Sequence, residues 1–414
     1  MRQRTSIAAL AGCVSLLAVT GCSSGFDGGD TAQEKGGKQN LTVLIASSGT
    51  AETQAVEDAV AGYEKASGNH VTVQTAKDMN QQLGQAFAGG NPPDVFYVNS
   101  DQFANYASGG SLYPYGEKIK DVQDFPATLR QSFTYDGKLT CVPKDAAALG
   151  LAINPKLWKA AGLTEKDYPK TWDELESAAK KLTKGKATGL VTSAEYQRLG
   201  AFMKEAGGWI TNRDQTKMTA DSRQNAEALN FVKKGLQAGW WKYAADVDSL
   251  NAGEAFGQGK AAMTIEGSWL AGQIQHDFPD TDYKLVDLPD GPAGKGNLAF
   301  TTCWGVAQQS KHRAAAVDLV QHLAATKQQA AMGEGFGAIP ARESAAEEYL
   351  SKHPERKPWT PIGEGIQGPV TVKGMDKVLG QLNSVLLSLK TADPKKILSD
   401  LQRNGEPVIE ESTK

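Results

Sequence analysis

The residues with the clearest chemical signal are tryptophans that stand beside glycine. The chain has eight tryptophans, and several lie in glycine-containing segments of loop-like composition. A tryptophan next to glycine presents a flat face that another molecule can approach. The apolar faces of sugar rings stack on such surfaces, while Asp, Asn and Glu fix the hydroxyls through hydrogen bonds. We expect Trp269 and Trp304 to contact a ligand. The tryptophans expected to pack in the core or on the surface are Trp158, Trp172, Trp240 and Trp241.

Motifs for catalysis, metal binding and nucleotide binding are weak. The chain has no Gly-x-Ser-x-Gly, no phosphate loop ending in Gly-Lys-Ser/Thr and no His-Glu-x-x-His, and its five histidines are scattered. One Gly-x-Gly-x-x-Gly spans residues 363–368, but no strand precedes it and Pro369 follows at once. We therefore predict no catalytic residue, no metal and no cofactor. A secreted glycosidase or lyase remains the enzymatic alternative, since a pair of carboxylates could serve a glycosidase.

The N-terminus carries a secretory signal. Arg2 and Arg4 precede an apolar stretch over residues 7–19, and small residues lead to Cys22. A cysteine after Val-Thr-Gly resembles the lipobox of bacterial lipoproteins, in which Cys22 is lipidated, for example by palmitate. We expect residues 1–21 to be removed, residues 22–40 to form a flexible tether, and the protein to be extracytoplasmic and anchored to the cell membrane through Cys22.

Composition and charge describe an ordinary globular protein. Hydrophobic residues make up 40% of the chain and charged residues 22%, and the length suggests two or three domains. Loss of Arg2 and Arg4 with the signal leaves 42 basic and 47 acidic residues, a net charge of −5. This balance excludes nucleic acid and favours an uncharged or weakly charged partner.

The hydrophobic pattern after the tether predicts an α/β fold. Strands are expected over residues 41–46, 71–75 and 94–98, with helices over 51–66 and 79–88 between them. This order implies a parallel sheet covered by helices. Ligands bind beyond the carboxyl ends of the strands in such sheets, so the residues after Val98 are placed at a site.

A second unit begins near Leu149. Residues 149–153 and 261–265 read as strands, and Thr171 with Glu174 forms a capping box before a helix. Further helices are expected over 314–331 and, as one or two surface helices, over 376–402. In an exported protein Cys141 and Cys303 could form a disulfide, and two buried thiols fit the sequence equally well.

The order of several short segments resembles one family of binding proteins. These segments are Pro93–Tyr97 followed by Asp101, Tyr135–Lys138 leading to Val142–Asp145, Leu151–Asn154, Thr171–Leu175, Phe256–Met263 with Gly267–Trp269, and Gly335–Pro340. Together they resemble the extracytoplasmic solute-binding proteins of carbohydrate ABC importers, the maltose-binding-protein-like family.

The resemblance implies a two-lobe periplasmic-binding-protein-like fold. Each lobe is a mostly parallel sheet flanked by helices, three hinge crossings join the lobes, and the sugar binds between them. By analogy the first lobe comprises residues 41–147 and 289–322, and the second 151–285 and 328–414. This division places Cys141 and Cys303 in the same lobe.

The resemblance also implies ligand-binding residues. Asp101 matches a sugar-contacting acid, Asp145 a frequent acceptor for hydroxyls, and Trp269 a stacking tryptophan. Val98 replaces an aromatic contact of the family, for which Tyr97 or Asn99 could substitute, and Ala147 replaces the glutamate of maltose-type sites. The other expected cleft residues are Tyr196, Glu266, Trp304 and Phe336.

The function expected from these observations is sugar capture for import. The protein would be a monomer that binds a mono- or oligosaccharide and delivers it to the transmembrane subunits of an ABC permease. The same sequence would suit a sensor subunit that presents its ligand to a membrane kinase. A third alternative is a binding protein for another solute, such as a polyamine, an amino acid or a metal.

Overall fold

The fold is described from a computed structural model over residues 37–361 and 364–412. The predicted signal over 1–21, the lipidation of Cys22 and most of the tether lie outside these residues. No helix in the described part of the chain has the length and apolar character needed to cross a membrane.

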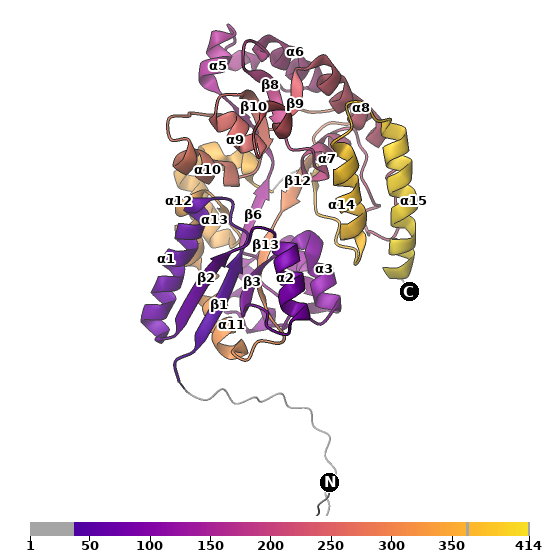
Figure 1. Ribbon diagram of the computed structural model, residues 1–414. Coiled ribbons are helices and arrows are strands. Elements are labelled where there is room, and N and C mark those ends of the chain that lie inside the picture. The colour runs from indigo at the N-terminus through magenta and orange to yellow at the C-terminus, as the bar shows by residue number, and fades with distance from the viewer. Residues whose placement is uncertain (1–36, 362–363, 413–414) are drawn as a thin grey trace, which may run out of the picture. The chain divides into compact units, whose positions relative to one another are not determined.

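The first lobe is built on a four-stranded sheet in the order β13-β3-β1-β2 (Figure 1). Its strands are β1 (Asn40–Ile45), β2 (His70–Thr75), β3 (Val95–Asn99) and β13 (Thr302–Val306). β1 pairs in parallel with β2 and β3, whereas β13 runs antiparallel to β3. The expected β-α-β-α-β order is confirmed. It places the end of β3 and the start of the next helix at the sheet's carboxyl edge.

Helices flank this sheet on both sides. They are α1 (Thr50–Ser67), α2 (Met79–Ala88), α3 (Ser100–Ser108), α4 (Ala127–Ser132), α11 (Arg313–Leu323) and α12 (Thr326–Phe336). A small hairpin, β4 (Thr134–Tyr135) with β5 (Lys138–Leu139), follows α4. Their apolar faces share one core with the strands, which include the fully buried Val43, Val95 and Phe96.

The second lobe contains a five-stranded sheet in the order β11-β7-β10-β8-β9. Its strands are β7 (Gly150–Ile153), β8 (Thr188–Thr192), β9 (Trp241–Tyr243), β10 (Ala261–Glu266) and β11 (Lys284–Val286). β8 pairs in parallel with β9 and β10, but β7 runs antiparallel to both β10 and β11. The sheet is therefore more mixed than predicted.

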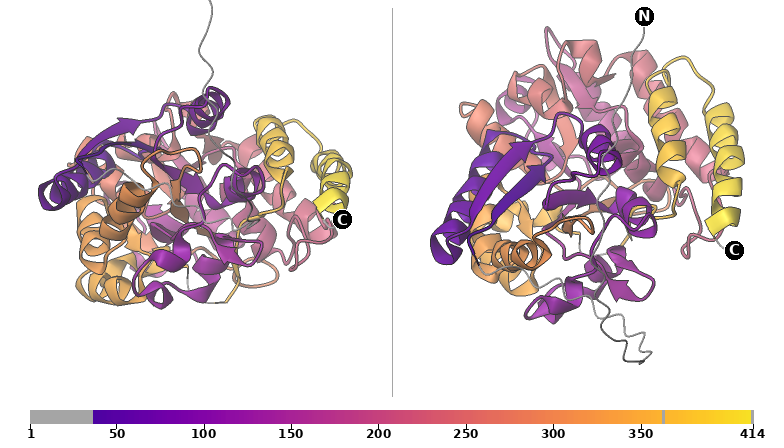
Figure 2. Two further views of the ribbon diagram at one scale, coloured as in Figure 1. Left: turned by 90° about the horizontal axis from the view of Figure 1, so that it is seen from below. Right: turned by 60° about the horizontal axis from the view of Figure 1, so that its bottom comes forward.

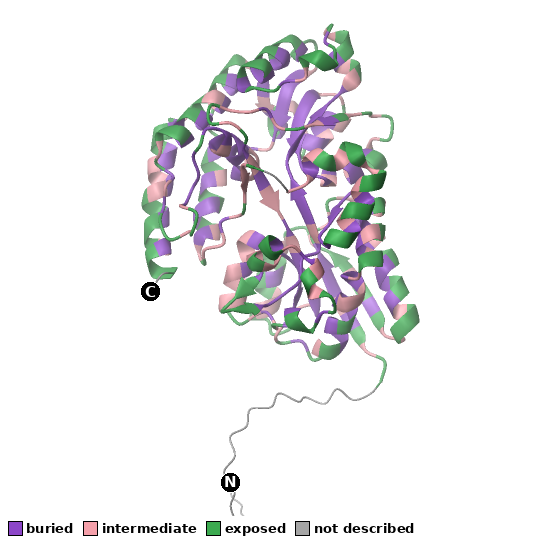
Figure 3. Cartoon of the chain, turned by 180° about the vertical axis from the view of Figure 1, so that it is seen from behind, coloured by how far each residue is buried: buried purple, intermediate pink, exposed green. Residues whose placement is uncertain are grey.

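The helices of the second lobe include the C-terminal pair, which lies side by side along one edge of the lobe (Figure 2). The set comprises α5 (Pro155–Ala160), α6 (Trp172–Leu182), α7 (Tyr196–Glu205), α8 (Arg223–Ala238), α9 (Ala252–Gly257), α10 (Trp269–Asp277), α13 (Glu343–Lys352), α14 (Met375–Leu386) and α15 (Pro394–Ser412). Most strands of the two larger sheets are buried, although the edge strand β2 is largely exposed, and the outer helix faces are exposed (Figure 3). The predicted cap of α6 is present, because the Thr171 hydroxyl accepts the backbone N–H of Glu174. The Glu174 carboxylate accepts the backbone N–H of Lys170 instead of that of Thr171.

A third small sheet connects the lobes. It has the order β14-β6-β12-β15, with β6 (Asp145–Ala148), β12 (Asn297–Phe300), β14 (Ile339–Pro340) and β15 (Ile366–Gln367). β6 and β12 pair antiparallel and run side by side between the two larger sheets (Figure 1). A disulfide joins Cys141 to Cys303, with Cα atoms 5.9 Å apart, just before β6 and just after β12.

One helix and two lobe assignments differ from the sequence prediction. The single helix predicted over 314–331 is wrong, because the chain leaves helical geometry at Ala325 and forms α11 and α12 instead. Met332 and Phe336 of α12 then pack in the first-lobe core, although 328–414 was assigned to the second lobe. Leu298 of β12 packs in the second-lobe core, although 289–322 was assigned to the first.

Candidate functional site

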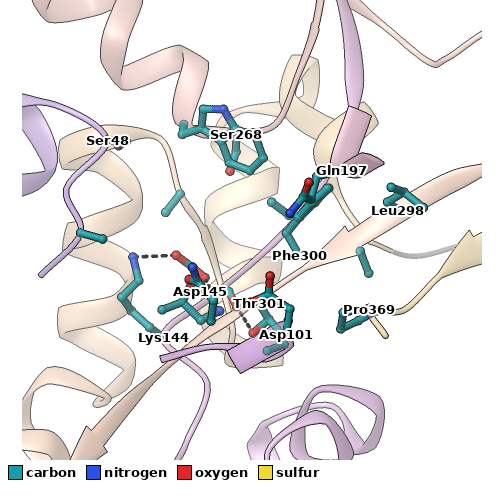
Figure 4. A pocket seen from close by; sticks show the side chains of 18 of the residues that line it. Ser48, Asp101, Lys144, Asp145, Gln197, Ser268, Leu298, Phe300, Thr301 and Pro369 are labelled. Atoms are coloured by element: carbon teal, nitrogen blue, oxygen red, sulfur yellow. Dashed lines mark hydrogen bonds and ion pairs between the residues drawn. The ribbon is translucent and has the colours of Figure 1, made fainter. Parts of the chain in front are cut away.

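A cavity of about 350 Å³ lies where the two lobes and the connecting sheet meet. Tyr97, Asn99 and Asp101 reach it from β3 and α3, while Tyr196 and Trp269 reach it from α7 and α10. Figure 4 shows Lys144 and Asp145 on one side of the cavity, with Gln197, Leu298 and Pro369 on the other. The volume lies in the range of about 300–1,000 Å³ that is usual for small-molecule sites.

A buried ion cluster forms one side of the cavity. The Lys144 ammonium lies 2.8 Å from Oε1 of Glu52 and 2.6 Å from Oδ2 of Asp145. The Tyr97 hydroxyl donates to Glu52 at 3.0 Å, and the Lys144 ammonium lies 4.3 Å from the centre of the Tyr97 ring. Oδ1 of Asp145 accepts the backbone N–H of Thr302 at 3.1 Å. Both oxygens of Asp145 are therefore held in place before a ligand arrives.

The contacts within the cluster keep Glu52 and Lys144 charged despite their burial. Burial alone would raise the pKa of Glu52, but the Lys144 charge and hydrogen bonds from Ser48 bring that pKa below its ordinary value. Burial would lower the pKa of Lys144, but Asp145 and Glu52 hold it well above the usual range. Burial and the Glu52 charge raise the pKa of Tyr97, so its hydroxyl stays protonated and donates.

Trp269 of the second lobe forms an aromatic face of the cavity. Nε1 of Trp269 donates to Oε2 of Glu266 at 2.7 Å, and the same oxygen accepts from Arg198 at 2.7 Å. The Arg198 guanidinium lies 5.0 Å from the Trp269 ring centre, and Phe300 meets Trp269 edge to face at 5.6 Å. These contacts fix the plane of the Trp269 ring, so it can serve as a preformed stacking surface.

Asp101 has a different environment from Asp145. It lies in the first turn of α3, and its Oδ1 is buried without a hydrogen-bond partner among the described residues. Burial and the nearby carboxylate of Asp376 raise the pKa of Asp101 above its ordinary value. The backbone N–H groups of Asp101 itself and of Gln102 partly offset this rise, and no group of the described residues donates to the buried Oδ1.

The structure brings most of the predicted site residues together. Those in the cavity wall are Tyr97, Asn99, Asp101, Asp145, Tyr196, Trp269 and Phe336. Glu266 is outside the wall and holds Trp269 from behind. Trp304 is also outside it, because its fully buried ring packs edge to face on Tyr97, 4.9 Å away, within the first-lobe core.

Four cavity residues that contact the predicted ones were missed at the level of the sequence, and three of them are charged. Glu52 and Lys144 line the cavity beside Asp145, and Arg198 and Phe300 line it beside Trp269. Lys144 directly precedes Asp145 in the chain, and Arg198 follows Tyr196 by two residues, so both stood beside predicted positions. Glu52 lies more than ninety residues from Lys144 in the sequence and gave no local signal.

Comparison with known proteins gives relatives of modest identity over most of the chain. The chain is 26% identical to the galactooligosaccharide-binding protein of Bacillus subtilis, covering 99% of this chain and 98% of that protein. It is 25% identical to the diacetylchitobiose-binding protein of Streptomyces coelicolor, covering 83% of each.

Solved structures show the same fold. An ABC substrate-binding protein from Listeria monocytogenes, in complex with cycloalternan, superposes with a TM-score of 0.81 at 24% identity, covering 91% of this chain and 99% of that one. The maltotriose-binding protein of Thermus thermophilus gives a TM-score of 0.77 at 23% identity, covering 90% and 100%. Residues 58–358 match the family model described as bacterial extracellular solute-binding protein. The two-lobe fold, the cavity between the lobes and this match together show that the chain belongs to the bacterial extracellular solute-binding protein family.

Proposed function

We propose that the protein is the binding component of an ABC transporter and captures a mono- or oligosaccharide between its two lobes. The observation that carries this proposal is the pairing of a fixed aromatic face, Trp269, with a fixed carboxylate, Asp145, across one cavity. An aromatic ring suits the apolar face of a sugar, and a carboxylate accepts two of its hydroxyls.

The cations of the cavity argue against a phosphate ligand. Lys144 and Arg198 already lie within 2.8 Å of carboxylates of the protein. An anionic ligand would have to compete with these partners, whereas a neutral sugar leaves the ion pairs intact. One relative, 24% identical, is a glycerol-3-phosphate-binding protein. The charge of the ligand therefore distinguishes binding of a neutral sugar from binding of a phosphate compound.

Capture works by a shift in population. A sugar that touches both lobes binds the closed arrangement more tightly than the open one and so favours closure. We propose that the closed form delivers the sugar to the transmembrane subunits of the permease. Lipid attachment at Cys22 would keep the monomeric protein at the membrane surface, outside the cytoplasm. We propose that it performs no chemistry on the sugar.

Calorimetric titration tests this function. The purified protein is titrated with neutral mono- and oligosaccharides, sugar phosphates, polyamines and amino acids, and bound sugars are then recovered and checked for cleavage. Binding of a neutral sugar that is recovered intact is the expected result. Binding of a polyamine or an amino acid alone would overturn the sugar assignment, and cleavage would reveal an enzyme.

A further inference from the structure

Acidic groups outnumber basic groups around the cavity. The charged residues in its wall are Glu52, Asp101, Asp145, Glu195, Lys144 and Arg198. Four of these six carry a carboxyl group and two carry a cation. Glu266 adds a further carboxylate directly behind Trp269.

Each cation in the wall is already shared between two carboxylates. Lys144 contacts Glu52 at 2.8 Å and Asp145 at 2.6 Å. Arg198 contacts Oε2 of Glu266 at 2.7 Å and lies 3.8 Å from Oε2 of Glu195. Among the described residues, neither cation forms an ion pair with Asp101.

Asp101 is the carboxyl group of the wall that has no cation partner among the described residues, and only the backbone N–H groups of Asp101 and Gln102 favour its charged form. Within residues 37–361 and 364–412 no lysine, arginine or histidine forms an ion pair with it, and its buried Oδ1 accepts no hydrogen bond. Beyond the effect of burial, the charge that raises the pKa of Asp101 is that of another carboxylate, Asp376 of α14, whose Oδ1 is also buried without a hydrogen-bond partner in the described part of the chain. A buried carboxylate without a partner is costly, and a ligand cation can supply the missing charge.

We propose that the cavity selects sugars that carry a protonated amine and places that amine at Asp101, while it rejects sugars that carry a carboxylate or phosphate. The proposal rests on the proposed function and narrows its substrate class. An ammonium donates up to three hydrogen bonds and neutralises the carboxylate, whereas a hydroxyl only donates one. An anion at the same place would meet the carboxylates of Asp101 and Asp376, which is like-charge repulsion in a region of low dielectric constant.

Matched sugar pairs test this proposal by calorimetry at pH 6, where amino sugars are protonated. The pairs are glucose with glucosamine, galactose with galactosamine, mannose with mannosamine, and cellobiose with chitobiose. Glucuronic acid and cellobiouronic acid serve as anionic counterparts. In at least one pair we expect the amino sugar to bind at least tenfold more tightly than its hydroxyl parent, with the corresponding acid weaker than both.

Two variants locate the effect. Asp101→Asn keeps the shape of the side chain, and it should bring the ratio of the affinity for the amino sugar to the affinity for its hydroxyl parent close to one. Asp58→Asn, on the exposed face of α1 and outside the cavity wall, is the matched control and should keep the wild-type ratio. The proposal is overturned if no amino sugar binds more tightly than its parent, or if Asp101→Asn keeps the preference. Binding of neutral sugars in that case leaves the proposed function standing, while the absence of sugar binding across the wider panel would remove both.

Discussion

The ammonium group of Lys144 holds two carboxylates at one side of the cavity, and only one of them, Asp145, is partly accessible to a ligand. Glu52 lies behind the cation with 5% of its side chain exposed, compared with 22% for Asp145. The cluster therefore holds Asp145 as an oriented acceptor, so no further ordering of this side chain is needed when a ligand binds. Lys144 acts on the ligand through Asp145 and is a positioning residue.

Replacing Lys144 should damage stability and affinity together. Lys144→Met leaves Glu52 and Asp145 without their counter-ion, which we expect to lower the free energy of unfolding by about 3–5 kcal/mol in a urea titration. Lys180→Met is the matched control, since Lys180 also lies 2.6 Å from a glutamate but is 55% exposed. Its cost should stay within about 1 kcal/mol. Equal costs for the two variants would contradict the importance of the buried cluster.

Removing the Trp269 ring should weaken sugar binding without unfolding the protein. We expect Trp269→Ala to raise the dissociation constant at least tenfold, about 1.4 kcal/mol, because the stacking face is lost. Trp269→Phe keeps a ring but loses the hydrogen bond to Glu266, so its dissociation constant should fall between those of the wild type and Trp269→Ala. Calorimetry measures the affinity and circular dichroism checks the fold. An unchanged affinity in Trp269→Ala would exclude Trp269 from the site.

The sequence predicted residues by their type better than it predicted their partners. Trp269 and Asp145 carry recognisable local contexts, and both lie in the cavity wall. Trp304 has the same glycine-flanked context, yet it is buried, because β13 pairs with β3 and turns this ring into the first-lobe core. Whether a side chain faces the core or the cleft depends on such pairing between distant strands, which local spacing does not reveal.

The connecting sheet is the element that couples the site to the lobes. β6 begins at Asp145 and β12 ends at Phe300, and both residues line the cavity, so the two strands that pass between the lobes also form part of the cavity wall. Lys144 donates its backbone N–H to the Thr302 carbonyl at 2.7 Å, directly beside the disulfide. Movement of either strand would therefore shift Asp145.

The disulfide should stabilise the first-lobe end of these strands. The double variant Cys141→Ala/Cys303→Ala is expected to lose about 2–5 kcal/mol of unfolding free energy, because the bond closes a long segment, 162 residues in separation, in the unfolded chain. Urea denaturation measures this loss. A thiol reductant should lower the stability of the wild type and leave the variant unchanged. A loss smaller than the experimental error would contradict a stabilising role.

Element boundaries show where sequence patterns stop being informative. The periodicity over 314–331 is continuous, because apolar residues recur through Ala324 and no glycine or proline marks the break. The chain nevertheless turns at Ala325, so that α12 packs against both α1 and α10. By contrast, the parallel order β1-α1-β2-α2-β3 follows from apolar strands and amphipathic helices, and it was predicted with nearly the observed bounds.

For the whole molecule, two buried glutamates make the free energy of unfolding depend on pH in opposite directions. The pKa of Glu52 is lowered in the folded protein, so its contribution is present above the ordinary value of 4.5 and is lost as pH falls. Burial raises the pKa of Glu205 well above 4.5, with Asp290 adding to the shift. The contribution of Glu205 to the stability of the folded protein is therefore fully present below pH 4.5, and it is lost as the pH rises through the raised pKa.

Glu205→Gln should make the protein more stable at neutral pH. Glu205 accepts a hydrogen bond from Nε1 of Trp172 at 2.5 Å, and the glutamine carbonyl can keep this bond without needing a proton. We expect a higher free energy of unfolding than wild type at pH 8 and a smaller difference at pH 4, measured by urea titration. Glu57→Gln, on the exposed face of α1, is the control. A variant that is less stable than wild type at pH 8 would show that Glu205 is charged when folded.

At the scale of the whole molecule, the proposed function requires that a sugar binds between the two lobes, in contact with both. The most direct measurement is a crystal structure of the protein with the sugar that titrates most tightly in calorimetry. We expect a sugar ring against Trp269 and at least one hydroxyl or amine on Asp145 or Asp101, so that residues of both lobes touch one molecule. A sugar bound outside this cavity, or in contact with one lobe only, would contradict it.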